Sequence, residues 1–136
     1  MKYLLDTNIC VFFLRGKYNI DKAIDQVGWE NCYISEITVL ELKYGVELSM
    51  QKDGKDRSQQ LNAFLENINI LPITDALNLT AKEKIRLRLA GTPADDDFDL
   101  LIACTSIVNN MIMVTENIKD FKNFSNIQLQ NWVVRK

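Results

Sequence analysis

The feature of this sequence that most constrains its fold is a regular alternation of short β-prone runs with helical segments. Runs of apolar and β-branched residues occupy positions 2–5, 32–34, 68–71, 111–115 and 127–129, and segments with helical spacing separate them. A helix between two strands lets the chain cross over, right-handed, to a parallel neighbour. We therefore predict an α/β fold, with a mostly parallel central sheet flanked by helices in an α/β/α sandwich, and a ligand site at the carboxyl ends of its strands.

Capping residues and apolar spacing indicate where the helices lie. Asp6 or Thr7 is expected to start a helix that runs to about Leu14. Further helices are expected near 20–27, over 35–50 with Ser35 as cap, near 61–65, over 75–89 with Asp75 as cap, over 95–109 and briefly near 119. Helical spacing predicts two inward faces, one formed by Ile37, Leu40, Tyr44 and Leu48 and the other by Leu77, Ala81, Ile85 and Leu89.

Bulk composition fits a single domain over residues 1–136. Hydrophobic residues make up 47% of the chain, and 16 Lys and Arg nearly balance 18 Asp and Glu, so a dedicated polybasic binder is not indicated. No apolar run approaches the roughly 18 residues of a spanning helix, and no signal peptide is expected. Cys10, Cys32 and Cys104 lie among apolar neighbours, which favours buried thiols in the cytoplasm over disulfides or a zinc site.

One absence restricts the chemistry: the chain contains no histidine. Mechanisms that use imidazole as the general base, including Ser-His and Cys-His hydrolysis, therefore have no candidate residue. Carboxylates acting with metal ions remain as the source of catalytic groups.

Four acidic residues stand where the predicted topology brings them to one edge of the sheet. Asp6 follows the first strand, Glu41 lies one to two turns into the helix that starts at Ser35, and Asp99 lies in the first turn of a helix that then enters the core. Asp120 follows the strand after that helix. Clustered carboxylates repel one another unless a cation neutralises them, so this arrangement predicts a Mg²⁺ or Mn²⁺ site suited to phosphodiester hydrolysis.

Each of these acids also has a purely structural interpretation. Asp6 is a good helix N-cap, and Thr38 with Glu41 matches a capping box if that helix begins at Thr38. Acids near Asp99 complement the helix dipole, and Asp120 is a common type of turn residue. The sequence pattern leaves these alternatives open.

Together these motifs resemble one family, the PIN-domain ribonuclease toxins of VapBC-type toxin-antitoxin pairs. The resemblance spans almost the whole chain and rests on four segments, which are residues 5–8 (Leu-Asp-Thr-Asn), 34–38 leading to Glu41 and Gly45, 98–103 (Phe-Asp-Leu-Leu-Ile-Ala) and 114–117 with Asp120-Phe121. Their order and spacing, more than any single segment, carry the similarity.

The resemblance implies that Asp6, Glu41 and Asp99 are catalytic and hold the metal. The family often carries a fourth acid two residues after the threonine matched by Thr115, and here that position is Asn117, which offers a carbonyl oxygen without a charge. Either Asn117 or Asp120 would then complete the Mg²⁺ or Mn²⁺ site, and we expect one tightly bound metal before RNA arrives. A supporting or substrate-positioning role is expected for Asn8, Thr115 and Asn117.

The resemblance also implies partners: an RNA substrate such as a tRNA loop or a messenger RNA, a cognate antitoxin that inserts a peptide near the site, and a second copy of the toxin in a homodimer. A non-catalytic PIN module that binds RNA or protein is the main alternative. A metal-dependent phosphatase or phosphotransfer domain fits less well, because Asn8 stands where haloacid-dehalogenase-like chemistry needs a second Asp. Basic residues on one helix, Lys82, Lys84, Arg86 and Arg88, are candidate RNA contacts or simply a solvated face.

Overall fold

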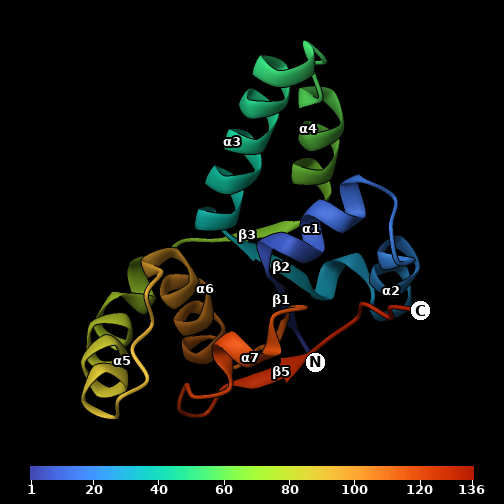
Figure 1. Ribbon diagram of the computed structural model, residues 1–136. Helices are drawn as coiled ribbons and strands as arrows, with labels where there is room; N and C mark the ends of the chain where they lie inside the picture. The colour runs from blue at the N-terminus through green and yellow to red at the C-terminus, as the bar shows by residue number, and fades with distance from the viewer.

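A five-stranded, wholly parallel sheet forms the centre of the molecule (Figure 1). The structure is a computed structural model that describes residues 1–136. The strands are β1 (Tyr3–Leu5), β2 (Cys32–Ser35), β3 (Asn69–Leu71), β4 (Ile112–Val114) and β5 (Gln128–Gln130), and their order across the sheet is β3-β2-β1-β4-β5. All five predicted strands are therefore present, and the predicted α/β class is confirmed.

The helices lie on both faces of this sheet. Their bounds are α1 (Thr7–Leu14), α2 (Ile20–Val27), α3 (Glu36–Asp53), α4 (Ser58–Asn67), α5 (Leu77–Leu89), α6 (Asp97–Val108) and α7 (Ile118–Phe121), with 3₁₀ turns at Trp29–Asn31 and Thr74–Ala76. In Figure 1 the far ends of α3 and α4 project together from the body, whereas α5 and α6 pack side by side on the other flank.

Alternate residues of each strand supply two separate cores, because successive side chains of a strand point to opposite faces. Leu5 and Val114 join a cluster with residues of α1, α2 and α4, such as Ile9 and Phe64. Their strand neighbours Leu4 and Met113 join a second cluster with residues of α5, α6 and α7 on the opposite face. Strands buried on both faces explain why these runs are continuously apolar.

The order of the strands creates a switch point between β1 and β4. The chain moves outward from β1 to β2 and β3 on one side, and it returns to place β4 and β5 on the other. Residues that follow β1 and β4 therefore meet at one crevice at the carboxyl edge, which is where ligands bind in open parallel sheets. The backbone N–H of Asp6 donates to the carbonyl of Val114 across this junction, at 2.9 Å.

Of the two predicted inward faces, the one on α3 was right only at Ile37 and the one on α5 was wrong. Leu40, Tyr44 and Leu48 of α3 are exposed, and the buried residues of this helix include Ile37, Thr38 and Leu42. Physically, only the first turns of α3 rest on the sheet, and α4 covers a different side of the helix than the apolar stripe suggested.

The same error occurs in α5, where Leu77, Ile85 and Leu89 are exposed and Leu87 and Glu83 are buried. Asp75 also does not cap this helix, because it lies inside the 3₁₀ turn that precedes it. Apolar stripes that face solvent mark surfaces left free by the fold, and the spacing alone did not distinguish them from core.

The structure also bears on the expectations about membrane spans and cysteines. No helix of the structure combines the length and apolarity needed to cross a membrane. Cys10, Cys32 and Cys104 are free and buried, as predicted. Burial raises the pKa of the Cys32 and Cys104 thiols to about 11, so they are protonated near neutral pH and unsuited to nucleophilic chemistry.

Candidate active site

Asp6 lies at the centre of the crevice and is almost fully buried. One oxygen of its carboxylate accepts a hydrogen bond from the backbone N–H of Thr7 at 2.8 Å, so the residue does begin α1 as an N-cap. The other oxygen accepts from the Thr115 hydroxyl at 2.8 Å and from the Asn8 amide at 3.4 Å. Burial raises the pKa of Asp6 and the negative charges of Glu41 and Asp120 raise it further, against the lowering effect of these hydrogen bonds.

Glu41 reaches the same crevice from α3. Its carboxylate accepts a hydrogen bond from the Thr7 hydroxyl at 2.7 Å, and the hydroxyl of the fully buried Thr38 lies 3.0 Å from that of Thr7. The helix begins at Glu36, with Ser35 as its N-cap. The capping-box interpretation of Thr38 and Glu41 is therefore wrong, and Glu41 is directed by Thr7.

Asp99 faces the crevice from the first turn of α6, where Asp96 caps the helix through the backbone N–H groups of Phe98 and Asp99. Burial and the charges of Asp96, Asp6, Glu41 and Asp120, in that order, raise the pKa of Asp99 to about 7. No hydrogen bond offsets these effects. The carboxylate is thus held close to other acids without a donor on its own chain.

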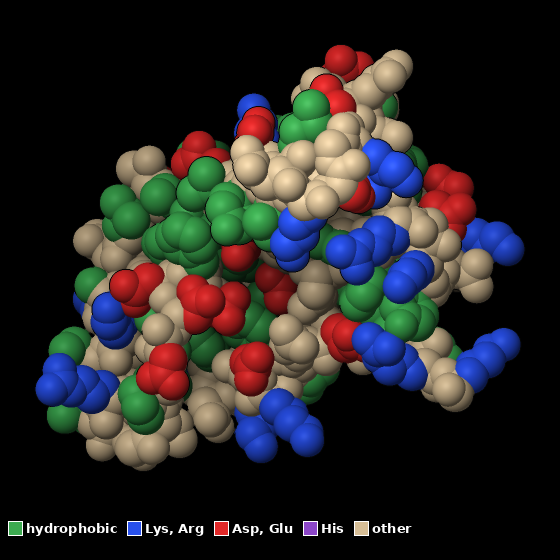
Figure 2. All heavy atoms as spheres, turned by 45° about the horizontal axis from the view of Figure 1, so that its top comes forward, with side chains coloured by type: hydrophobic (Ala, Val, Ile, Leu, Met, Phe, Trp, Pro, Cys, Tyr) green, Lys and Arg blue, Asp and Glu red, His purple; other side chains and the backbone are tan.

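Asp120 and Asn117 border the opening. Asp120 lies in α7 and lines a pocket of about 450 Å³ with Asp96, Asp99 and Lys119. The backbone N–H of Asn117 donates to the Thr115 hydroxyl at 3.0 Å. The Asn117 side chain is exposed, so it remains a candidate both as a metal ligand and as a residue that supports the site. Figure 2 shows acidic side chains gathered in and around a hollow, with a hydrophobic area on one side and Lys and Arg side chains on the other.

The donor set suits a hard divalent cation. All four acids offer oxygen ligands, and a cation between them would offset both the burial and the repulsion that raise the pKa of Asp99. No group of three acidic, histidine or cysteine side chains is drawn together closely enough to form a metal cage by itself. Oxygen ligands and electrostatics therefore fit a hard divalent cation such as Mg²⁺ or Mn²⁺.

Comparison with known proteins assigns this arrangement to a family. A model of the PIN domain matches residues 3–127. The chain belongs to the PIN-domain family. The match covers β1 to α7, and therefore includes all four acids.

Similar proteins to this PIN domain are named as nucleases. "Ribonuclease VapC2" of Rickettsia felis is 34% identical over 97% of this chain and 98% of its own length, and "tRNA(fMet)-specific endonuclease VapC" of Salmonella typhimurium is 27% identical over the same shares. The chain also superposes on a crystal structure of VapBC2 from Rickettsia felis bound to a promoter DNA fragment, with a TM-score of 0.86, 32% identity and coverage of 97% and 99% of the two chains.

Sequence reasoning on this PIN domain missed how the acids are held. Thr7, which it considered only as a cap, directs Glu41, and Asp96 contributes more than Asp6 does to the raised pKa of Asp99. The role of Thr38 was also missed, although its position one turn before Glu41 places both on one side of α3. Contacts of this kind join residues far apart in the chain, and no local pattern marks them.

Proposed function

We propose that this chain is a Mg²⁺- or Mn²⁺-dependent endoribonuclease and the toxin of a toxin-antitoxin pair. The observation that carries the proposal is the convergence of Asp6, Glu41, Asp99 and Asp120 at the β1/β4 switch point, in a chain without histidine. Names of the similar proteins support RNA as the substrate, and a tRNA is one candidate target. Three free cysteines are consistent with the cytoplasm as its compartment.

The residues of the site divide the work. Asp6, Glu41 and Asp99 would hold the ion, with Asp120 as a further ligand at the open side. A bound divalent ion supplies Lewis-acid activation of water and neutralises charge on the phosphodiester. Thr115 and Asn8 hold the Asp6 carboxylate in one orientation, and Thr7 does the same for Glu41.

Cleavage of total RNA by the purified protein tests this proposal. We expect discrete cuts with Mg²⁺ or Mn²⁺, none with EDTA, and 5′-phosphate ends on the products. Asp99→Asn should abolish the cuts. Asp97→Asn is the matched control, because Asp97 lies in the same helical turn but pairs with Lys84 at the surface. Equal cleavage by the wild type and Asp99→Asn would overturn the catalytic assignment, and no metal binding by a folded protein would favour a non-catalytic module.

A groove beside the site offers a place for the antitoxin. Its volume is about 550 Å³, and it runs between α1, α3 and α4, with Val11, Leu42 and Val46 in its apolar lining and Glu41 at its inner end. Similar structures are those of DNA-bound VapBC2 from Rickettsia felis and of DNA-bound VapBC from Salmonella typhimurium. A peptide in this groove would reach the acids and block RNA. Val46→Glu should weaken antitoxin binding and spare cleavage, whereas Met50→Glu, outside the groove on the same helix, should change neither.

The exposed apolar faces of α3 and α5 support a homodimer. Tyr44 is 64% exposed and Ile85 is 54% exposed, and α6 packs between their helices. Exposed apolar surface of this extent typically marks a protein interface. Sedimentation should give a dimer for the wild type and a monomer for Tyr44→Lys or Ile85→Lys. Val108→Lys, at an exposed apolar position at the end of α6, should leave the dimer intact.

A further inference from the structure

The last residues of the chain return to the loop that borders the active site. After β5, the backbone N–H of Val133 donates to the Asn131 side chain at 2.8 Å, which forms a tight turn. Val133 is buried in the core on the α1 face, and the Trp132 ring packs on Tyr3 with centroids 5.5 Å apart. This anchoring fixes the direction of the backbone and brings Arg135 over the loop that follows β4.

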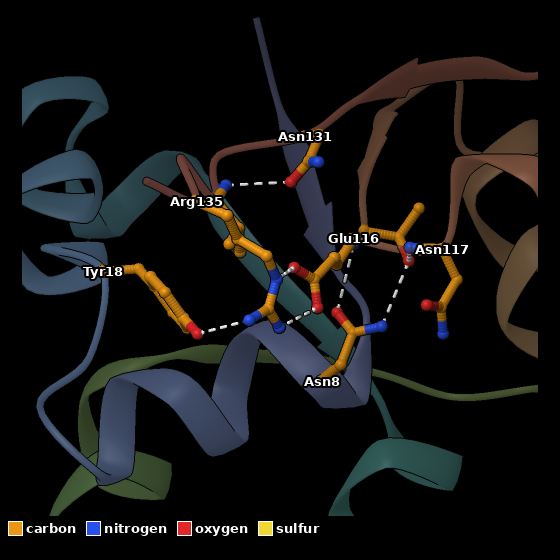
Figure 3. A network of polar contacts seen from close by, with 8 residues as sticks. Asn8, Tyr18, Glu116, Asn117, Asn131 and Arg135 are labelled. Atoms are coloured by element: carbon orange, nitrogen blue, oxygen red, sulfur yellow. Dashed lines mark hydrogen bonds and ion pairs between the residues drawn. The ribbon is translucent and has the colours of Figure 1, made fainter.

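Arg135 joins the loop that follows β4 to the turn that follows α1. Its guanidinium donates to both carboxylate oxygens of Glu116, at 2.5 and 2.9 Å, and to the Tyr18 hydroxyl at 2.7 Å. The same group lies over the rings of Tyr18 and Phe12, at 5.0 and 6.0 Å from their centroids. Figure 3 shows Arg135 between Tyr18 and Glu116. Bidentate geometry and several partners distinguish this contact from an ordinary surface ion pair.

Glu116 connects this contact to the acids. Its backbone N–H donates to the Asn8 side-chain carbonyl at 3.3 Å (Figure 3), and the Asn8 amide donates to Asp6 at 3.4 Å and to Thr115 at 3.3 Å. Thr115, the neighbour of Glu116, donates to Asp6 at 2.8 Å. An unbroken series of contacts therefore runs from Arg135 through Glu116 and Asn8 to the buried carboxylate.

Tyr18 links the same arginine to the far end of α1. Tyr18 and Asn19 both have positive φ angles, 58° and 54°, which non-glycine residues adopt at a cost. Two contacts hold this turn. The rings of Phe12 and Tyr18 pack edge to face, and Arg135 donates a hydrogen bond to the Tyr18 hydroxyl. Both ends of α1 are thus tied to Arg135, and the first turn of α1 carries Thr7 and Asn8.

We propose that Arg135 is a positioning residue of the active site, which clamps Glu116 so that Asn8 and Thr115 stay hydrogen-bonded to Asp6. The inference rests on the proposed function. It assigns a role in the nuclease site to a residue 129 positions after Asp6, in a segment outside the PIN-domain match. Arg135 itself donates to Glu116 and Tyr18 and to none of the four acids.

Variants of Arg135, Glu116 and Lys136 can distinguish a positioning role from direct RNA contact and from a merely structural contact. We would compare Arg135→Gln, Glu116→Gln, the double variant and the charge swap Arg135→Glu/Glu116→Arg with the wild type. Lys136→Gln is the matched control, since it removes the same charge next to the clamp and Lys136 forms no ion pair. Readouts are Mn²⁺ affinity without RNA, hydrogen exchange of residues 115–117 without metal, and kcat and KM on a cleaved RNA.

The clamp predicts a specific pattern. Each single variant should weaken Mn²⁺ binding about threefold to tenfold, below the roughly 10- to 100-fold typical of direct partners of metal ligands. The double variant should be no worse than either single one, and the charge swap should recover part of the loss. Exchange of residues 115–117 should accelerate, kcat should fall with KM nearly unchanged, and Lys136→Gln should match the wild type.

Other results overturn the clamp. A raised KM in Arg135→Gln alone, with normal Mn²⁺ binding, would show that Arg135 contacts RNA directly. A lower melting temperature with unchanged Mn²⁺ affinity and kcat would show a merely structural contact. Failure of the proposed function looks different, because the wild-type protein itself would then bind no Mn²⁺ or cleave no RNA.

Discussion

The two halves of the acidic site are held in different ways. In one half, Asp6 and Glu41 accept hydrogen bonds from Thr7, Asn8 and Thr115, and Asp6 is only 4% exposed. In the other half, Asp99 has no hydrogen bond to offset its neighbours' charges, and Asp120 lies exposed at the border of a pocket. Hydrogen bonds within the chain hold the acids of one half, whereas Asp99 in the other half has no such donor.

Such a site must keep a buried carboxylate ionised without also weakening its attraction for a cation. A buried carboxylate without donors would be expensive to ionise, and the hydrogen bonds from Thr115 and Thr7 lower the pKa of Asp6 against the effect of burial. If donors also satisfied Asp99, its attraction for a cation would weaken. Burial, and then the charges of the neighbouring acids, raise the pKa of Asp99 to about 7, and no hydrogen bond opposes these effects. The hydrogen-bonded half therefore contributes stability, while both halves supply oxygen ligands for the proposed cation.

The largest expected effect comes from neutralising one acid in each half. Asp6→Asn and Asp99→Asn should both reduce RNA cleavage by about 100-fold or more, since each removes a charged oxygen ligand. Their effects on stability without metal should be opposite. Asp6→Asn places an amide against the Asn8 amide and loses about 1–2 kcal/mol, whereas Asp99→Asn relieves repulsion and raises the melting temperature.

Paired cleavage assays and thermal melts in EDTA measure both effects. The control is Asp97→Asn, which removes an exposed ion pair and should change neither value appreciably. If both active-site variants shifted the melting temperature in the same direction, the two halves would not differ as described.

Replacing a donor in the closed half should have the next largest effect. Thr115→Val keeps the shape of a fully buried side chain but removes the hydroxyl that donates to Asp6 and accepts from the Asn117 N–H. We expect a loss of about 1–3 kcal/mol in the free energy of unfolding and roughly tenfold or more weaker Mn²⁺ binding. Denaturant unfolding and Mn²⁺ titration measure these losses. Thr105→Val is the control, because the Thr105 hydroxyl only donates to a carbonyl of its own helix.

The difference between the halves also explains what the sequence could predict. Strand positions and the acids were predictable, because apolar runs and a parallel topology determine which residues follow β1 and β4. Partners of the acids were not, since Thr7 meets Glu41, and Thr115 meets Asp6, only after distant segments pack. Helix faces failed for a related reason: Leu40 and Ile85 have core-like spacing but lie on surfaces that this chain leaves uncovered.

A moderate effect is expected from replacing Glu83, which holds the loop after α7 next to Asp120. Glu83 is 5% exposed and accepts hydrogen bonds from the Arg86 guanidinium and the backbone N–H of Ser125, and Arg86 also donates to the carbonyl of Asn123. These contacts fix the loop after α7, the helix that carries Asp120. Glu83→Gln should cost about 1–3 kcal/mol in the free energy of unfolding at neutral pH.

Denaturant unfolding should compare Glu83→Gln with Asp53→Asn, because Asp53 forms a similar ion pair with Arg57 at the exposed surface and its replacement should cost clearly less. Arg86 lowers the pKa of Glu83, so this contribution is present at neutral pH and fades as pH falls below about 4.5. Equal losses in the two variants would mean that the open half rests on a loosely held loop, and its openness would then need no electrostatic cause.

The smallest expected effect is a pH dependence that comes mainly from Asp99, with Asp6, whose pKa is also raised, acting in the same direction. The pKa of Asp99 is raised in the folded protein from 3.8 to about 7, so between these values the folded state binds a proton that the unfolded state has released. Stability without metal therefore falls as pH rises through this window and becomes constant above it. Acids whose pKa is lowered, such as Glu83 and Glu116, act in the opposite direction but mainly below about pH 4.5.

Thermal melts in EDTA between about pH 5 and 8 isolate this effect when the wild type is compared with Asp99→Asn. The melting temperature of the wild type should fall relative to the variant by a few degrees as pH rises, the scale of about 1 kcal/mol in a domain of this size. Mg²⁺ should remove most of the difference, because a cation replaces the proton in neutralising the carboxylate. A constant difference across this range would place the unfavourable charge elsewhere, and the contrast between a closed half and an open half would lose its electrostatic basis.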